Sequence, residues 1–160
     1  RQKEDKGTLV ASFKEFGFRA PLADGINLTG FIDRVDIFER DGQFTASIID
    51  YKSNRLNDSH GADEKALNYK EQLLSYAWAL NQISFYKGKK VKVEEVLLYF
   101  LNKGEVVSID LEKEEIEGIV KTLVNSTPWI LGNKPLSDFQ CHKSEKCSWC
   151  LCKKYCKDLS

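Results

Sequence analysis

The stretch from Gly30 to Lys52 constrains the fold most, because its letters alternate like two strands joined by a short turn at 40–42. Successive side chains of a strand point to opposite faces, so every second residue shares a face. One face of the first predicted strand holds Phe31, Asp33, Val35 and Ile37. We therefore expect Asp33 to lie in an otherwise apolar row.

The second predicted strand, 43–52, brings another carboxylate to the same neighbourhood. Its shared face holds Ala46, Ile48, Asp50 and Lys52. A buried carboxylate is costly unless it is paired or binds a metal, and Lys52 can compensate only part of two negative charges. This pattern predicts a divalent cation, with a structural Asp50–Lys52 salt bridge as the alternative.

At these residues the chain resembles the PD-(D/E)XK nucleases, with Ile32-Asp33 followed by Asp50-Tyr51-Lys52. The letters GFIDRVD, IIDYKS and QLLSYAWAL look like the RecB-type branch, which includes the nuclease domains of the AddAB and RecBCD recombination machines. The resemblance implies an α/β (α+β), restriction-endonuclease-like fold, in which helices flank a mixed central sheet.

The resemblance also implies roles for the hairpin residues. Asp33 and Asp50 would hold Mg²⁺ or Mn²⁺ together with the main-chain carbonyl of Tyr51. Lys52 would orient and help to deprotonate the attacking water and stabilise the phosphate.

A helical period runs from about 63 to 85. Its packed face is predicted to hold Tyr69, Gln72, Leu73, Tyr76 and Leu80, with Lys70, Glu71 and Ser75 away from it. In the family this helix lies beside the catalytic hairpin, so Gln72 and Tyr76 would position the site or the DNA. The alternative is that Tyr76 is a core aromatic and Gln72 makes a capping hydrogen bond.

The remaining pattern predicts one cored domain over 1–140 and a small cysteine-rich segment over 141–160. The 160 residues are 42% hydrophobic and 30% charged, which suffices for one such core. We expect the end of a helix at 1–13, strands at 16–22, 91–101 and 105–110, and a helix at 111–130. The chain begins at Arg1 and contains no methionine, which suggests a segment of a longer protein.

The charge of the chain does not by itself indicate a nucleic-acid binder. Twenty-four basic side chains balance twenty-four acidic ones. Basic runs at 87–92 and in the last twenty residues can meet phosphate or simply face solvent. No signal peptide or membrane span is apparent, so we expect a cytoplasmic protein.

All five cysteines lie near the C-terminus, at Cys141, Cys147, Cys150, Cys152 and Cys156. An odd number confined to one end of an apparently cytosolic chain indicates metal or cluster ligation. Zinc could use Cys141, Cys147, Cys150 and Cys156, with His142 in reserve. Unligated thiols are the third possibility.

The spacing Cys147-x2-Cys150-x5-Cys156 resembles the terminal cysteine triplet of AddB-like and CRISPR-associated iron-sulfur nucleases. Those proteins carry a fourth cysteine far upstream. For a 4Fe-4S cluster here, that ligand was either lost with an upstream segment or is replaced by Cys141. Cys152 falls outside the spacing.

The family also places a Glu or His on a helix before the first strand, for which Glu4 and Glu15 are the only nearby candidates. The resulting hypothesis is a metal-dependent deoxyribonuclease, an exonuclease of DNA repair or recombination with a helicase domain or partner. The alternative is a non-catalytic DNA-binding or assembly module stapled by a zinc or iron-sulfur site.

Overall fold

The computed structural model describes residues 6–53, 61–132, 145–148, 150 and 153. The chain divides into two compact units, Arg1–Asn125 and Ser126–Ser160. The candidate hairpin and its surroundings belong to the first unit.

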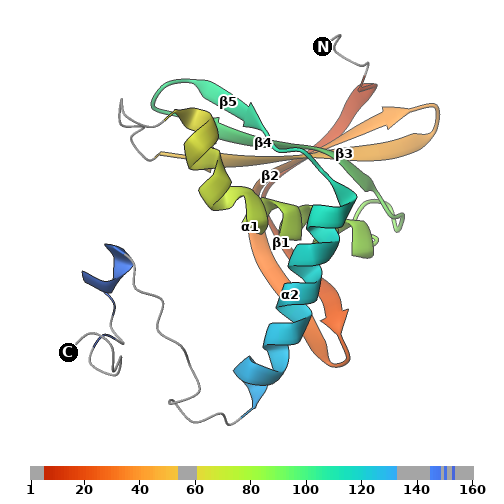
Figure 1. The fold of residues 1–160 in the computed structure, drawn as a ribbon. Coiled ribbons are helices and arrows are strands. Elements are labelled where there is room, and N and C mark those ends of the chain that lie inside the picture. The colour runs from red at the N-terminus through yellow and green to blue at the C-terminus, as the bar shows by residue number, and fades with distance from the viewer. Residues whose placement is uncertain (1–5, 54–60, 133–144, 149, 151–152, 154–160) are drawn as a thin grey trace. The chain divides into compact units, whose positions relative to one another are not determined.

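A five-stranded mixed sheet forms the centre of the first unit (Figure 1). Its strands follow one another in chain order: β1 (Thr8–Ala23), β2 (Ile26–Arg40), β3 (Gln43–Lys52), β4 (Lys92–Phe100) and β5 (Glu105–Ser108). Neighbouring strands are antiparallel except β3 and β4, which are parallel. A parallel pair needs a crossover, and α1 (Ala62–Gln82) lies within that connection. The expected mixed sheet with helices is confirmed.

Strand β1 begins much earlier than its sequence suggests. The expectation of a helix end at 1–13 is wrong for the described residues, because the strand already starts at Thr8. From there it pairs with β2 along nearly its whole length, from Thr8 opposite Glu39 to Ala23 opposite Ile26. The partner of Thr8 lies about thirty residues further along the chain, so the sequence around Thr8 says little about where the strand begins.

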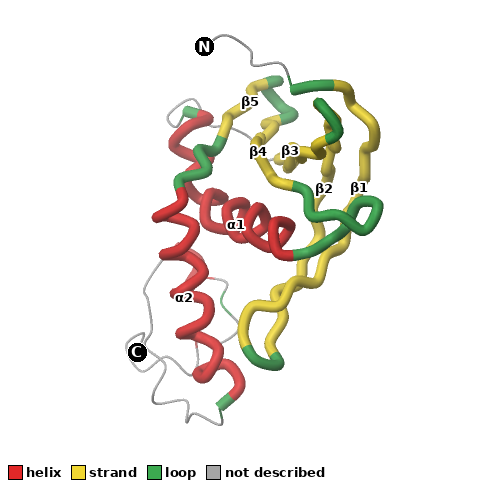
Figure 2. Tube along the Cα trace, turned by 90° about the vertical axis from the view of Figure 1, so that its right-hand side faces the viewer, coloured by secondary structure: helices red, strands yellow, loops and turns green. Residues whose placement is uncertain are grey.

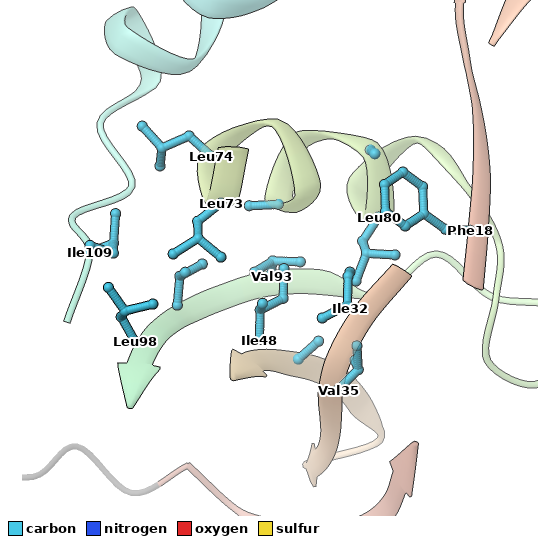
Figure 3. Packing of buried hydrophobic residues seen from close by; sticks show 14 of the residues in the cluster. Phe18, Ile32, Val35, Ile48, Leu73, Leu74, Leu80, Val93, Leu98 and Ile109 are labelled. Carbon is cyan, nitrogen blue, oxygen red and sulfur yellow. The ribbon is translucent and has the colours of Figure 1, made fainter. Parts of the chain in front are cut away.

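Helix α1 covers one face of the sheet and closes the hydrophobic core. Gly61 precedes its first turn, where Asp63 and Glu64 suit the positive end of the helix dipole. Leu73 and Leu80 are fully buried against apolar side chains of β2, β3 and β4 (Figure 3). Burial of each such leucine contributes about 2 kcal/mol.

Ser75 corrects one detail of the predicted helix face. It was expected to lie away from the packed side, yet it is buried, and its hydroxyl donates a 2.7 Å hydrogen bond to the carbonyl of Glu71. That bond satisfies the hydroxyl within its own helix, so the serine can be buried without a distant partner.

Helix α2 (Lys113–Leu131) packs beside α1 over the part that belongs to the first unit (Figure 2). Lys70 of α1 and Glu115 of α2 form an ion pair of 2.7 Å, and this carboxylate raises the pKa of Lys70. Ile116 and Ile119 pack against the buried core. The sequence placed this helix within about two residues of its observed start and end.

The second unit contains the end of α2 and a short 3-10 helix, η2 (Glu145–Ser148). Cys147 is half-buried and Cys150 is exposed. Cys141, Cys152, Cys156 and His142 lie outside the described residues. Among the helices that the structure describes, none combines the length and the hydropathy needed to cross a bilayer.

Candidate active site

Strands β2 and β3 separate at the place where the two candidate carboxylates lie. Their ladder ends with Arg34 opposite Ile49. Beyond that pair, the Asp33 side chain accepts the next hydrogen bond: its Oδ2 accepts a 2.8 Å bond from the backbone N–H of Tyr51. A side chain therefore replaces the missing backbone acceptor, which fixes Asp33 against the end of β3.

Asp33 does not lie in the apolar row predicted for it. Asp33 and Phe31 are exposed, whereas Ile32 and Val35 both belong to the buried cluster. The alternation therefore breaks between positions 32 and 35. The neighbouring strand is irregular at the same level, because Glu15, between the partners of Arg34 and Ile32, has a φ of 48°.

Glu15 is also one of the two candidates for the family's upstream acid. It is exposed on β1 and lies across the ladder from Asp33. It is carried by a strand and not by a helix, in contrast to the expected family arrangement. Glu4 lies outside the described residues.

Asp50 is buried as the alternation of β3 predicts, with 5% of its surface exposed. Its Oδ2 forms a 2.7 Å ion pair with the ammonium of Lys52 and has no further partner among the described residues. Burial raises the pKa of the Asp50 carboxyl, the Lys52 ammonium opposes that shift, and the nearby charge of Asp33 adds to it. Asp50 is thus a carboxylate whose ionised form is poorly compensated by the protein alone.

Lys52 is held from two directions. Its ammonium pairs with Asp50 and also lies 4.4 Å from the centre of the Tyr69 ring. A cation over an aromatic face is attracted by the ring's quadrupole, and the contact restricts the flexible lysine stem. Since only 20% of the lysine side chain is exposed, its charge faces the site more than bulk water.

One stripe of α1 follows the edge of the site. Tyr69 contacts Lys52, while Tyr76 packs edge-on against Phe18, with the ring centres 5.3 Å apart. Gln72 lies between them on the helix, three residues after Tyr69 and four before Tyr76. Its amide donates a 2.7 Å hydrogen bond to the Tyr76 hydroxyl. The predicted neighbours Gln72 and Tyr76 are therefore in direct contact.

Gly30 shows how closely this stripe approaches β2. A Cβ at Gly30 would lie 2.9 Å from the Phe18 ring and 3.1 Å from the Tyr76 ring. No residue with a side chain fits there without displacing one of the two rings. Tyr76 is thus a half-buried packing residue whose hydroxyl accepts a hydrogen bond from Gln72. The role of these two residues toward the site or the DNA stays a prediction.

The comparison with known families decides the assignment. The family model described as "PD-(D/E)XK nuclease superfamily" matches residues 1–157. This chain belongs to the PD-(D/E)XK nuclease superfamily. Its fold is also similar to the solved structure of SSO0001, with 16% sequence identity and a TM-score of 0.51 over 91% of this chain. The chain covers 60% of that protein, and a likeness at this identity concerns the fold alone.

The donor set of this PD-(D/E)XK site fits a hard divalent cation. Asp50 Oδ2 is a buried oxygen without a hydrogen-bond partner among the described residues, and Asp33 is held beside it. Carboxylate and carbonyl oxygens are the ligands that Mg²⁺ and Mn²⁺ prefer. Within the described ranges, no group of three or more His, Cys, Asp or Glu side chains gathers. Among the residues that the structure describes, a further protein ligand would come from the backbone.

The backbone of Tyr51 is oriented to supply that ligand. The Lys52 carbonyl accepts a hydrogen bond from Leu101 N–H, so Lys52 faces β4. Successive residues of a strand direct their backbone groups to opposite sides, so those of Tyr51 face β2. Its N–H already meets Asp33 there, and its carbonyl points to the same side.

Arg34 and Asp36 form a second charged pair, on the same strand as Asp33. Arg34 contacts Asp36 twice, from Nε at 2.9 Å and from Nη2 at 2.8 Å. Asp36 and then the Tyr51 hydroxyl raise the pKa of Arg34 further above its ordinary value. Asp36 thus has partners for both of its oxygens, whereas Asp50 Oδ2 has only the Lys52 ammonium.

The basic run after α1 lies away from the two carboxylates. Lys87 and Lys89 each place their ammonium 5.4 Å from the centre of the Phe44 ring. Phe44 and Asp50 are six residues apart on β3, which corresponds to about 20 Å along a strand. The run is therefore not part of the Asp33–Asp50 neighbourhood.

Tyr69 is the site residue that sequence reasoning missed. The helical pattern placed it on the packed face with Gln72 and Tyr76 but gave it no role. Its position relative to Lys52 depends on the crossover connection, which brings the start of α1 back over the end of β3. The helical spacing of Tyr69, Gln72 and Tyr76 was the signal in the sequence that could have identified Tyr69.

Proposed function

We propose that this chain is a metal-dependent nuclease that hydrolyses phosphodiester bonds of DNA. The observation that carries the proposal is the state of Asp50: its buried Oδ2 has only the Lys52 ammonium as a partner within the described residues, and Asp33 adds a second negative charge nearby. One ammonium cannot balance two neighbouring carboxylates, whereas Asp36 is paired with the Arg34 guanidinium through both of its oxygens. Superfamily membership supports phosphodiester hydrolysis as the chemistry.

The residues of the chain take distinct roles in this proposal. Asp33, Asp50 and the Tyr51 carbonyl bind Mg²⁺ or Mn²⁺, which when bound supplies Lewis-acid activation of water and neutralises phosphate charge. Lys52 orients the attacking water, helps to deprotonate it, and places positive charge where the pentavalent phosphate gains negative charge. Tyr69 holds the lysine stem.

Gln72 and Tyr76 hold the substrate strand beside these groups. The Tyr76 hydroxyl accepts from Gln72, so its own proton remains to be donated to a phosphate or sugar oxygen. Gln72 is exposed, and its carbonyl oxygen is the remaining acceptor of the pair.

The finer assignment follows the resemblance of GFIDRVD and IIDYKS to RecB-type nucleases. On that basis we propose an exonuclease of DNA repair or recombination, cytoplasmic, with a helicase domain or subunit as its partner. We further propose that Cys147, Cys150 and Cys156, with Cys141, bind a 4Fe-4S cluster, with Zn²⁺ as the alternative occupant.

The test is degradation of linear and covalently closed circular DNA with and without Mg²⁺ or Mn²⁺. Linear DNA should disappear only with metal, while the circle persists if the enzyme needs ends. Lys52→Met should lower the rate about 10²- to 10³-fold, the loss typical of removing one group that stabilises charge in the transition state. Lys90→Met, at an exposed lysine of the run after α1, is the matched control. A Lys52→Met variant that cleaves normally would reject this mechanism.

A second function is favoured by one observation, the lack of a third acidic or histidine ligand near the carboxylates in the described part of the chain. It is a non-catalytic DNA-binding or assembly module that keeps the fold. Such a module would bind DNA with metal present and leave it intact, so measuring binding and cleavage on the same DNA separates the two proposals.

A further inference from the structure

Phe31 is the most exposed large apolar side chain among the residues that the structure describes, with 76% of its surface accessible. Its ring lies across Gly17, its partner on β1. A Cβ at Gly17 would be 3.0 Å from Cε1 of that ring and 3.4 Å from Cδ1. The ring is therefore supported by backbone on one side and open to solvent on the other.

The position of this ring on β2 links it to the candidate site. Phe31 and Asp33 flank the buried Ile32, and both of these side chains are exposed. Two residues along a strand span about 7 Å. That length is comparable to the reach from a phosphate to the base of its own nucleotide. The distance along the strand from the Phe31 ring to the Asp33 carboxylate, which the Tyr51 N–H holds in place, therefore matches the distance from a phosphate to its base.

We propose that Phe31 is a substrate-binding residue that stacks on an unpaired nucleobase next to the scissile phosphate. The inference rests on the proposed nuclease function and adds the class of substrate, a single strand or a frayed end. Stacking on a ring needs a free base face, which a base inside a duplex does not offer. Every base has such a face, so Phe31 confers strand preference without sequence preference.

The binding test uses the full chain in EDTA, where no cleavage occurs. Short single-stranded DNA oligonucleotides carry 2-aminopurine at one position at a time, and its fluorescence is quenched when the base stacks on an aromatic ring. The wild type and Phe31→Trp should quench one position strongly. Phe31→Ala should lose that quenching and bind more weakly by roughly 5- to 150-fold, the range expected for one stacked base.

Two controls distinguish loss of base stacking from loss of exposed apolar surface as the cause of weaker DNA binding. Leu9→Ala removes another exposed apolar side chain of the same sheet, beside Phe38, and should bind like the wild type. An abasic site at the quenched position should weaken wild-type binding and leave Phe31→Ala unchanged, so that the two proteins bind this DNA equally.

The outcomes also separate this inference from the proposed function. Wild-type cleavage together with unchanged binding by Phe31→Ala would overturn the stacking role and leave the nuclease intact. An equal loss by Phe31→Ala on normal and abasic DNA would likewise overturn it. A wild type that degrades linear duplex DNA but neither binds nor cleaves single strands would overturn the stacking role alone, and one that degrades neither DNA with Mg²⁺ or Mn²⁺ would overturn both. Since Phe31 is exposed, its alanine variant should melt at the wild-type temperature, which checks the fold.

Discussion

The ammonium of Lys52 lies between the carboxylate of Asp50, 2.7 Å away, and the ring of Tyr69, whose centre is 4.4 Å away. The two contacts act together on one flexible side chain. The carboxylate fixes the direction of the charge, and the ring limits the positions of the stem. A lysine held in this way can act on one point of a substrate.

Tyr69→Leu should therefore lower kcat with little change in KM, because the variant keeps Lys52 but loosens its position. A cation over an exposed or partly buried ring contributes about 0.5–2 kcal/mol, which predicts a fall of roughly two- to thirtyfold. Tyr69→Phe keeps the ring and should retain most of the activity. Steady-state rates on one DNA substrate make the comparison; an equal loss in the Phe and Leu variants would assign the effect to the hydroxyl.

Asp50→Asn should stabilise the metal-free protein at neutral pH. Burial raises the pKa of Asp50 in the folded state above the unfolded value of about 3.9. The folded state therefore binds this proton more tightly. The stability that Asp50 contributes is largest below that unfolded pKa and falls as the pH rises through the raised folded pKa.

The measurement is the free energy of unfolding of both proteins in EDTA at several pH values between about 4 and 7.5. The advantage of the Asn variant should shrink as the pH falls, and comparing the two proteins cancels the titration of all other groups. Mg²⁺ should stabilise the wild type alone. An Asn variant that is less stable at pH 7 would mean that attraction to Lys52 outweighs the cost of burying the carboxylate.

The cysteine-rich segment, residues 141–160, should stabilise the fold and take no part in catalysis. Metal or cluster ligation closes a long loop and contributes large binding free energy to folding. Serine at Cys147, Cys150 or Cys156 should lower the melting temperature and release the bound metal, whereas serine at Cys152 should do neither.

Metal analysis of anaerobically purified protein distinguishes the occupants of this segment. A 4Fe-4S cluster makes the protein brown, with iron and sulfide in equal amounts, and zinc leaves it colourless with one metal per chain. A metal-free protein whose stability ignores all of these substitutions would identify the cysteines as ordinary thiols.

The sequence predicted the part of the site in which burial follows local alternation. Asp50 shares the buried face of β3 with Ile48 because a strand has a period of two and one face meets the core. The contact of Gln72 with Tyr76 follows equally from the helical spacing of four. Both relationships are set within a few residues.

What the sequence could not supply depends on distant partners. The exposure of Asp33 follows a break in alternation opposite Glu15, whose positive φ is a property of the paired strands and not of its own letter. The contact of Lys52 with Tyr69 likewise needs the crossover that returns α1 over the end of β3. The early start of β1 has the same origin, since Thr8 joins the sheet by pairing with Glu39 of β2.

Asp36→Ala should separate stability from catalysis on the strand that carries Asp33. Asp36 is 5% exposed and binds the Arg34 guanidinium through both carboxylate oxygens. Its removal leaves a partly buried arginine without this partner, so the free energy of unfolding should fall by about 1–3 kcal/mol. Because the pair is satisfied away from Asp50, the activity per folded molecule should stay within about threefold of the wild type, a change of less than 1 kcal/mol in the barrier.

The matched experiment places Asp36→Ala beside Asp50→Ala, Arg34→Ala and the double variant Arg34→Ala/Asp36→Ala. Urea unfolding should show a smaller loss for the double variant than the sum of the two single losses, because each single variant already breaks the pair. Asp50→Ala should show the opposite behaviour, with an intact fold and a rate about 10²- to 10³-fold lower. Equal losses of activity in Asp36→Ala and Asp50→Ala at full folding would place Asp36 in the metal site and reject the assignment of Asp33 and Asp50 as the metal-binding carboxylates.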